Sequence, residues 1–177
     1  MSARMQQVIS RLKVYRALAA MEPKLFLAYS TWVWMEFFVQ IVAMTVFVYF
    51  WRAVYTNHAT LGGLSFDQTL NYILLAQILA PVMATQLIYI FGYGMQEGRI
   101  GIELLRPVDF QARYYVESLA DMVTALLLKA PLTVLAMAVF GLRLPSDWRI
   151  WAAFAVALLL GHAVIFCFDW ILACLAF

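Results

Sequence analysis

Six polar side chains interrupt otherwise apolar stretches, and they are the residues of this sequence best suited to moving protons or charged solutes. They are Glu36, Gln40, Asp121, Lys129, His162 and Asp169. An ionisable group in the middle of a bilayer costs about 3 kcal/mol, so these groups are expected to face other helices or a wet cavity. Two interpretations remain open: a polar translocation path with a proton relay through His162 and Asp169, or structural pairing between helices.

Other catalytic chemistry finds little support in the residues. The sequence has no Gly-x-Ser-x-Gly or His-Glu-x-x-His pattern, and its two histidines, His58 and His162, lie in different regions. We therefore expect no catalytic residue and no metal site. Cys167 and Cys174 are seven residues apart in an apolar stretch, about 10 Å along a helix, which is too far for a disulfide. We predict that both are buried thiols.

The composition is that of a membrane protein. Of 177 residues, 66% are apolar and 12% are charged, whereas a soluble domain is about half apolar and a quarter charged. A soluble chain of this length could not bury so much apolar surface. The net charge of +2 gives no reason to expect a nucleic-acid partner.

Four apolar segments are each long enough to cross a bilayer, which takes about 20 helical residues. They cover residues 29–51, 69–96, 118–141 and 148–177. Tryptophans and tyrosines gather near their ends, as amphipathic rings do at membrane interfaces. The sequence thus predicts an all-α, polytopic helical bundle, with a transmembrane domain over residues 29–177.

The basic residues predict the orientation. Residues 1–28 have the pattern of an amphipathic elbow helix lying in the headgroup region, and a solvated basic leader is the alternative. This leader and the loop at 97–117 carry eight Lys and Arg residues, whereas the other two loops carry three. The excess predicts a cytoplasmic N-terminus.

Local signals mark where the helices begin and end. Ser65 and Gln68 have the spacing of a capping box, which starts the second span. Gly141 and Pro145 predict a helix end followed by a turn, so that the third and fourth spans form an antiparallel hairpin. Pro131 lacks a backbone N–H and predicts a kink in the third span.

The loop at 97–117 is the most distinctive part of the chain. Gly98 and Gly101 allow sharp turns, no Gly-Lys-Ser/Thr follows them as in a phosphate-binding loop, and Pro107 ends any helix before it. Apolar residues alternate here with charged ones. The pattern predicts a short amphipathic element that either docks a partner or lies on the membrane surface.

Three stretches together resemble a known family. They are Phe50-Trp-Arg-Ala-Val-Tyr55, Leu64-Ser-Phe-Asp-Gln-Thr-Leu-Asn-Tyr72, and residues 97–111, Glu-Gly-Arg-Ile-Gly-Ile-Glu-Leu-Leu-Arg-Pro-Val-Asp-Phe-Gln. The chain resembles permease subunits of type-2 ATP-binding-cassette (ABC) exporters, in the branch described for drug, daunorubicin or viologen export.

The resemblance implies a non-catalytic permease in the bacterial cytoplasmic membrane, working as an identical or paralogous pair among membrane lipids. A separate ATPase dimer would bind ATP and Mg²⁺, and the permease would bind no cofactor itself. The coupling helix seated on that ATPase would be formed by Glu97, Gly98, Arg99, Gly101, Glu103, Leu104, Leu105, Arg106 and Pro107.

The chain departs from the family in its number of spans. Six are expected and four are present, which suggests a C-terminal truncation. The cargo would be a small amphiphilic, drug-like or lipid-like molecule. The alternative function is a proton- or ion-coupled secondary transporter that uses Glu36, Asp121, Lys129, His162 and Asp169.

Overall fold

The structure, a computed structural model, describes residues 13–21, 23–24, 28, 30–57 and 59–175. The structure is 81% helical, which confirms the all-α prediction. Its elements are α3 (Ser30–Tyr55), β1 (Thr60–Leu61), β2 (Leu64–Ser65), α4 (Phe66–Met83), α5 (Leu87–Gln96), α6 (Arg99–Leu104), α7 (Phe110–Leu128), α8 (Ala130–Phe140) and α9 (Trp148–Cys174). Most of the predicted elbow helix, residues 1–28, lies outside the described residues. In its described part, residues 13–19 are helical.

Within the described residues, four helical segments are long and apolar enough to cross a membrane: Thr31–Tyr55, Phe66–Gln96, Phe110–Phe140 and Trp148–Cys174. The third begins earlier than the predicted residue 118. The Asp109 side chain accepts a hydrogen bond from the Ala112 N–H at 2.7 Å and starts α7 there. The connection between the second and third spans, residues 97–109, is therefore shorter than the predicted 97–117, and it contains α6.

Two of the four spans are interrupted. The second is broken at residues 84–86, between α4 and α5, a few residues after Pro81 in the last turn of α4. The third changes from α7 to α8 at Lys129, and Pro131 lies in the first turn of α8. Proline removes one backbone donor and crowds the preceding turn, so the predicted kink at Pro131 is present and the one after Pro81 was missed.

A hairpin turn joins the first two spans at the end opposite α6, whereas residues 141–147 join the last two spans without the predicted turn. Gly62 and Gly63 both have positive φ, as a two-residue hairpin turn between β1 and β2 requires. The predicted capping box is present, with Ser65 and Gln68 exchanging backbone-to-side-chain hydrogen bonds. Gly141 ends α8 with φ 75°, and Asp147 caps the start of α9.

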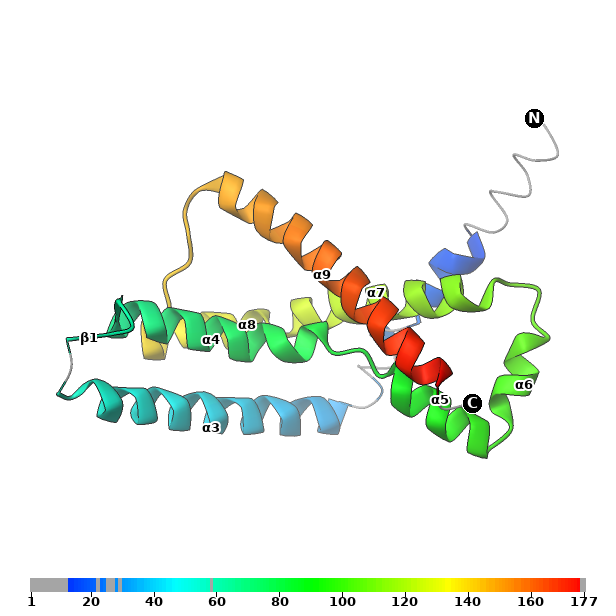
Figure 1. The fold of residues 1–177 in the computed structure, drawn as a ribbon, viewed down its shortest axis with the longest axis horizontal. Helices are drawn as coiled ribbons and strands as arrows, with labels where there is room; N and C mark the ends of the chain where they lie inside the picture. Colours follow the sequence, from blue (N-terminus) through cyan, green and yellow to red (C-terminus); the bar gives the residue numbers. More distant parts are fainter. Residues whose placement is uncertain (1–12, 22, 25–27, 29, 58, 176–177) are drawn as a thin grey trace.

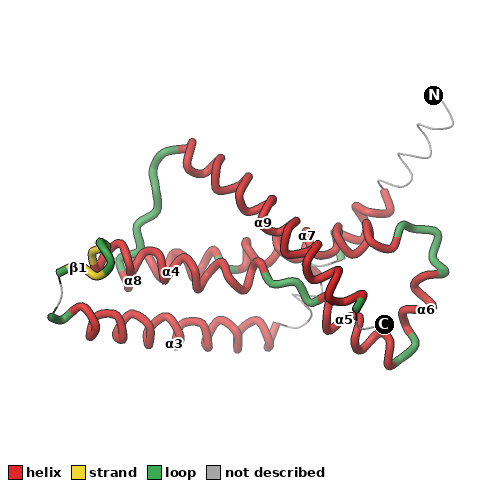
Figure 2. Tube along the Cα trace, viewed as in Figure 1, coloured by secondary structure: helices red, strands yellow, loops and turns green. Residues whose placement is uncertain are grey.

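The helices form two packed groups along the long axis of the molecule (Figures 1 and 2). One core lies between α3, α4 and α8 and is centred on Met44, Leu74 and Leu132. The second core joins α5, α6, α7 and α9 around Phe91 and Tyr114. The helix α9 leaves α8 and slants across the molecule to pack chiefly on α5, so the third and fourth spans are not a closely packed hairpin.

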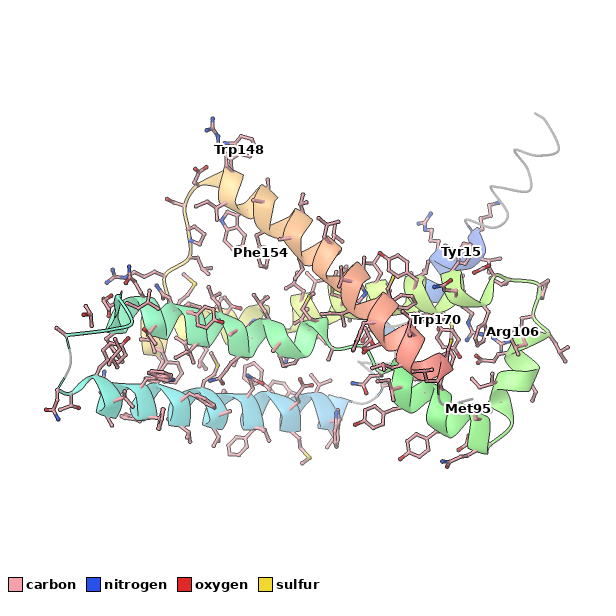
Figure 3. All side chains as sticks on the ribbon, in the orientation of Figure 1. Tyr15, Met95, Arg106, Trp148, Phe154 and Trp170 are labelled. Atoms are coloured by element: carbon pink, nitrogen blue, oxygen red, sulfur yellow. The ribbon has the colours of Figure 1, made fainter. Side chains whose placement is uncertain are left out.

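The basic leader and the loop that carries α6 can be placed relative to each other along the molecule. Figure 3 places Tyr15, Met95 and Arg106 toward the end that carries α6, and Trp148 away from them at the start of α9. The described part of the basic leader thus lies toward the same end as the loop that carries α6. This arrangement fits the charge asymmetry on which the predicted orientation rests.

Candidate coupling helix and intramembrane polar contacts

The helix α6 is anchored to the transmembrane helices by its inner face. Ile100 is only 4% exposed and packs with Phe91 of α5 and Tyr114 of α7. Gly94 of α5 makes room for it, because a Cβ atom at position 94 would lie 3.0 Å from the Ile100 Cδ1 atom. A displacement of α6 would therefore press directly on α5.

A second anchor is polar. The Tyr114 hydroxyl donates to Glu103 Oε2, and Arg113 Nη2 lies 3.4 Å from Glu103 Oε1. Arg113 also donates from Nε to Glu117 Oε1 at 2.8 Å. These side chains are largely shielded from solvent, and charge-assisted hydrogen bonds in such places are stronger than exposed ones. Glu103 thus ties α6 to the first turns of α7.

Aromatic rings continue this contact into the bundle. The ring centroids of Phe91 and Tyr114 are 5.4 Å apart, and those of Phe91 and Trp170 are 5.3 Å apart. Phe110 lies 5.0 Å from Tyr114, and Phe166 lies 5.8 Å from Trp170. Aromatic pairs at these distances, edge-to-face, tilted or stacked, add stability beyond burial alone. The cluster joins α5, α7 and α9 directly beside α6.

The outer face of α6 is unoccupied by the described part of the chain. Leu105 is 85% exposed, Ile102 is 65% exposed, and Leu104, Arg106 and Pro107 are exposed as well. Glu97 and Arg99 form an exposed ion pair at 2.6 Å. Scattered exposed apolar residues are ordinary, but here they lie on α6 and at its C-terminal end, beside charged residues.

The two glycines of the loop behave differently. Gly98 has φ 70° and forms the left-handed turn from which α6 starts, as predicted. Gly101 lies inside α6, so the prediction that it forms a turn is wrong. A Cβ atom there would meet nothing within 4 Å, although glycine in a helix costs about 1 kcal/mol relative to alanine.

The predicted translocation residues are not gathered into one line. Lys129 Nζ donates to Glu36 Oε1 at 2.6 Å, with the lysine side chain 10% exposed and the glutamate 42%. Gln40 Nε2 donates to the Gln77 carbonyl oxygen at 3.0 Å. That carbonyl would normally accept from the N–H of residue 81, which is Pro81 and has none. Gln40 thus supplies the donor that the proline removes.

The polar groups of α9 bond to two other spans. His162 is buried, and its Nε2 atom lies 3.1 Å from the Ser118 hydroxyl. Thr85, in the break of the second span, donates to Asp169 Oδ2. The two groups therefore have separate partners and are not bonded to each other. Asp121 makes no hydrogen bond within the described residues.

Several contact residues were missed at the sequence level. Thr85, Arg113, Tyr114, Glu117 and Ser118 all hold a predicted residue or its neighbour, yet none was singled out. Proline at position 81 was the available signal for a break near Thr85.

The cysteine prediction is wrong in one respect: Cys167 and Cys174 are free but exposed on α9. Among the described residues no group of His, Cys, Asp and Glu could hold a metal ion.

A family model described as "ABC-2 family transporter protein" matches residues 40–177. The chain belongs to the ABC-2 transporter family. It is a multi-pass membrane protein and a permease component of an ABC transporter, and family membership implies association with an ABC ATPase. Neither the curated proteins nor the solved structures that were compared gave a match.

Proposed function

We propose that this ABC-2 permease exports a small amphiphilic, drug-like or lipid-like molecule across the bacterial cytoplasmic membrane, with its N-terminus in the cytoplasm. The energy would come from a separate ATPase dimer, which binds ATP and Mg²⁺ and seats α6 on its surface. A second permease, identical or paralogous, would complete the pathway. The observation that carries this proposal is the two-sided character of α6.

The outer face of α6 presents exposed apolar and charged side chains that a partner protein can bind. Ile102 and Leu105 are one helical turn apart and exposed, and Arg106 adds a charge beside them. Partner proteins commonly receive such apolar anchors in a pocket and surround them with polar contacts. Gly101 lies next to these residues with open space around it, so a partner backbone could approach closely.

The inner face of α6 contacts the transmembrane helices to which a displacement of α6 would be passed. Ile100 packs against α5, and Glu103 accepts hydrogen bonds from Arg113 and Tyr114 of α7. Beyond them the aromatic cluster continues to Trp170 of α9. Packed elements such as these pass on a displacement because they have little free space to absorb it.

The experiment separates docking from transmission. Leu105→Asp and Arg106→Glu, on the outer face, should reduce co-purification of the full chain with its ATPase by about tenfold or more. Tyr114→Phe and Glu103→Gln, on the inner face, should leave co-purification intact, retain ATP hydrolysis and lower ATP-dependent transport. Arg149→Glu, an exposed arginine at the other end, is the matched control for Arg106→Glu. The proposal fails if the outer-face variants bind the ATPase and transport like the parent.

The alternative, a proton- or ion-coupled carrier, receives less support. The contacts of Glu36, Lys129, His162 and Asp169 are separate pairs between helices rather than a chain of groups. This carrier would transport without ATP when a pH gradient is applied, and His162→Ala would abolish that activity. Transport that requires ATP and ignores the gradient would exclude it.

A further inference from the structure

The breaks in the second and third spans coincide with the boundary between the two packed groups of helices. The first group contains α3, α4 and α8, and the second contains α5, α6, α7 and α9. Residues 84–86 separate α4 from α5, and Lys129 separates α7 from α8. Each of the two interrupted spans therefore passes from one group to the other at the point where its helix is broken.

Few backbone hydrogen bonds hold either break. Ala84 is extended, with φ −67° and ψ 127°, and α5 begins with the bond from the Ile90 N–H to the Gln86 carbonyl at 2.9 Å. At the other break, Pro131 has no N–H to donate to the carbonyl of residue 127, as a continuous helix would require. Helices bend where such bonds are missing, so both breaks are suited to act as hinges.

The polar contacts do not hold the two groups together. Within the described residues, no side-chain hydrogen bond or ion pair joins a helix of the first group to a helix of the second. Lys129 donates to Glu36 of the first group, and Thr85 donates to Asp169 of the second. A rotation about the breaks can keep all these contacts, which matters because an unpaired ionisable group inside the membrane is costly.

The two groups meet through apolar side chains where α4 packs on α7 and α9. Val82 of α4 and Met122 of α7 are buried but belong to neither core. Gly161 of α9 leaves room for the Met83 side chain, because a Cβ atom at position 161 would lie 3.2 Å from the Met83 Cε atom. A methionine side chain is flexible and adapts to a neighbour that moves.

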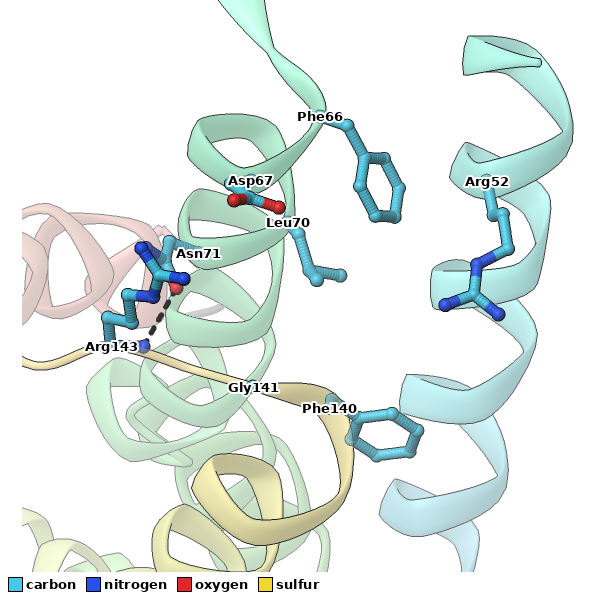
Figure 4. A pocket seen from close by; sticks show the side chains of 8 residues that line it. All are labelled: Arg52, Phe66, Asp67, Leu70, Asn71, Phe140, Gly141 and Arg143. Atoms are coloured by element: carbon cyan, nitrogen blue, oxygen red, sulfur yellow. Dashed lines mark hydrogen bonds between the residues drawn. The ribbon is translucent and has the colours of Figure 1, made fainter.

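The first half of α9 is free to follow the second group. None of residues 148–160 is buried, whereas Phe166 and Ala173 in the second half are. The chain reaches α9 from the first group through residues 141–147. The start of this loop is fixed to α4, because the Arg143 N–H donates to the Asn71 amide oxygen at 2.9 Å (Figure 4). The first half of α9 diverges from α4 and α8 beyond this loop (Figure 1).

We propose that residues 84–86 and Lys129 form a double hinge inside the membrane, about which the second group turns against the first. Ile100 and Glu103 make α6 part of the second group, so α6 moves with it. The turn changes the distance between α9 and the first group. The proposal rests on the proposed function in one respect, namely that the ATPase supplies the displacement of α6 that drives the turn.

Double electron–electron resonance on the full chain in lipid nanodiscs measures this movement, with spin labels on cysteine pairs and the native cysteines replaced by serine. The pair Val46→Cys and Val164→Cys links the two groups. Val46→Cys with Val139→Cys lies within the first group, and Tyr89→Cys with Val164→Cys within the second; all four positions are exposed. Without the ATPase, the linking pair should give a broad distribution of distances and the two within-group pairs narrow ones.

Proline substitutions and ATP should act on the linking pair alone. Pro81→Ala with Pro131→Ala restores a backbone donor near each break and should narrow the linking distribution to the width of the within-group pairs. Val134→Ala, an exposed position close to the second break, is the control and should leave it broad. With the ATPase present, ATP should shift the mean distance of the linking pair by about 5 Å or more, and those of the within-group pairs by less than about 2 Å.

The outcomes separate the hinge from the docking of α6. A linking pair as narrow as the within-group pairs in the parent chain, or a broad one that the proline substitutions leave unchanged, would overturn the double hinge. Equal shifts of all three pairs with ATP would overturn it as well. A broad linking pair that narrows in the proline variant but does not respond to ATP would support the hinge and contradict the proposed coupling through α6.

Discussion

The hydrogen bond from Gln40 to the Gln77 carbonyl predicts an energetic coupling between Gln40 and Pro81. The carbonyl lacks its usual helical donor because residue 81 is proline. Gln40→Leu should leave it without a donor inside the membrane. Hydrogen bonds between membrane helices are worth about 0.6 kcal/mol on average and up to about 1.7 kcal/mol. We expect a loss of about 1 kcal/mol in the free energy of unfolding.

The same substitution should cost much less in a Pro81→Ala background. Residues 77 and 81 are both within α4, so the backbone N–H restored at position 81 would point at the Gln77 carbonyl. The Gln40→Leu change should then be nearly neutral, which gives a coupling energy of about 1 kcal/mol between positions 40 and 81.

Reversible unfolding of the purified chain in mixed micelles, titrated with sodium dodecyl sulfate, measures all four members of this cycle. Thr45→Val is the control, because the Thr45 hydroxyl bonds to the Ile41 carbonyl of its own helix and should show no coupling to position 81. If Gln40→Leu costs the same in both backgrounds, the idea that Gln40 replaces the donor missing at Pro81 is refuted.

Three further predictions concern stability. Glu36→Gln should destabilise the chain by about 2–3 kcal/mol in the same titration, because Lys129 is left unpaired in the membrane. Adding Lys129→Met should recover most of this loss. A double variant no more stable than the single one would contradict the pairing. Gly94→Ala should destabilise the chain by about 1–3 kcal/mol through its clash with Ile100. Adding Ile100→Val, which shortens the side chain, should relieve part of that cost. An unchanged free energy of unfolding for Gly94→Ala would show that α6 is not seated on α5. Ser65→Ala should cost about 1 kcal/mol by removing one half of the capping box, and an unchanged unfolding midpoint would argue against that cap.

The sequence predicted what depends on local chemistry. Span positions follow from apolar length, the start of α4 from the Ser65 and Gln68 pair, and the end of α8 from Gly141. These features are determined within a few residues of one another, so they can be predicted without knowledge of the fold.

Contacts between distant segments could not be predicted in the same way. Lys129 and Glu36 are 93 residues apart, and Asp169 and Thr85 are 84 residues apart. Each polar residue had several possible partners on other helices, and only the packing of the helices against one another selects among them. The anchors of α6 on α7 were missed for a related reason: α7 starts at Phe110, so Arg113 and Tyr114 lie on a helix rather than in the predicted loop.

The most direct test of the central claim is a cross-link from the outer face of α6. Leu105→Cys, introduced into the full chain with Cys167 and Cys174 replaced by serine, should form a covalent adduct with the ATPase subunit when a thiol-reactive cross-linker is added to membranes. Trp148→Cys, at the other end of the molecule, should form none. An adduct at position 148 equal to that at 105, or no adduct at 105, would contradict the claim that α6 is where this permease meets its ATPase.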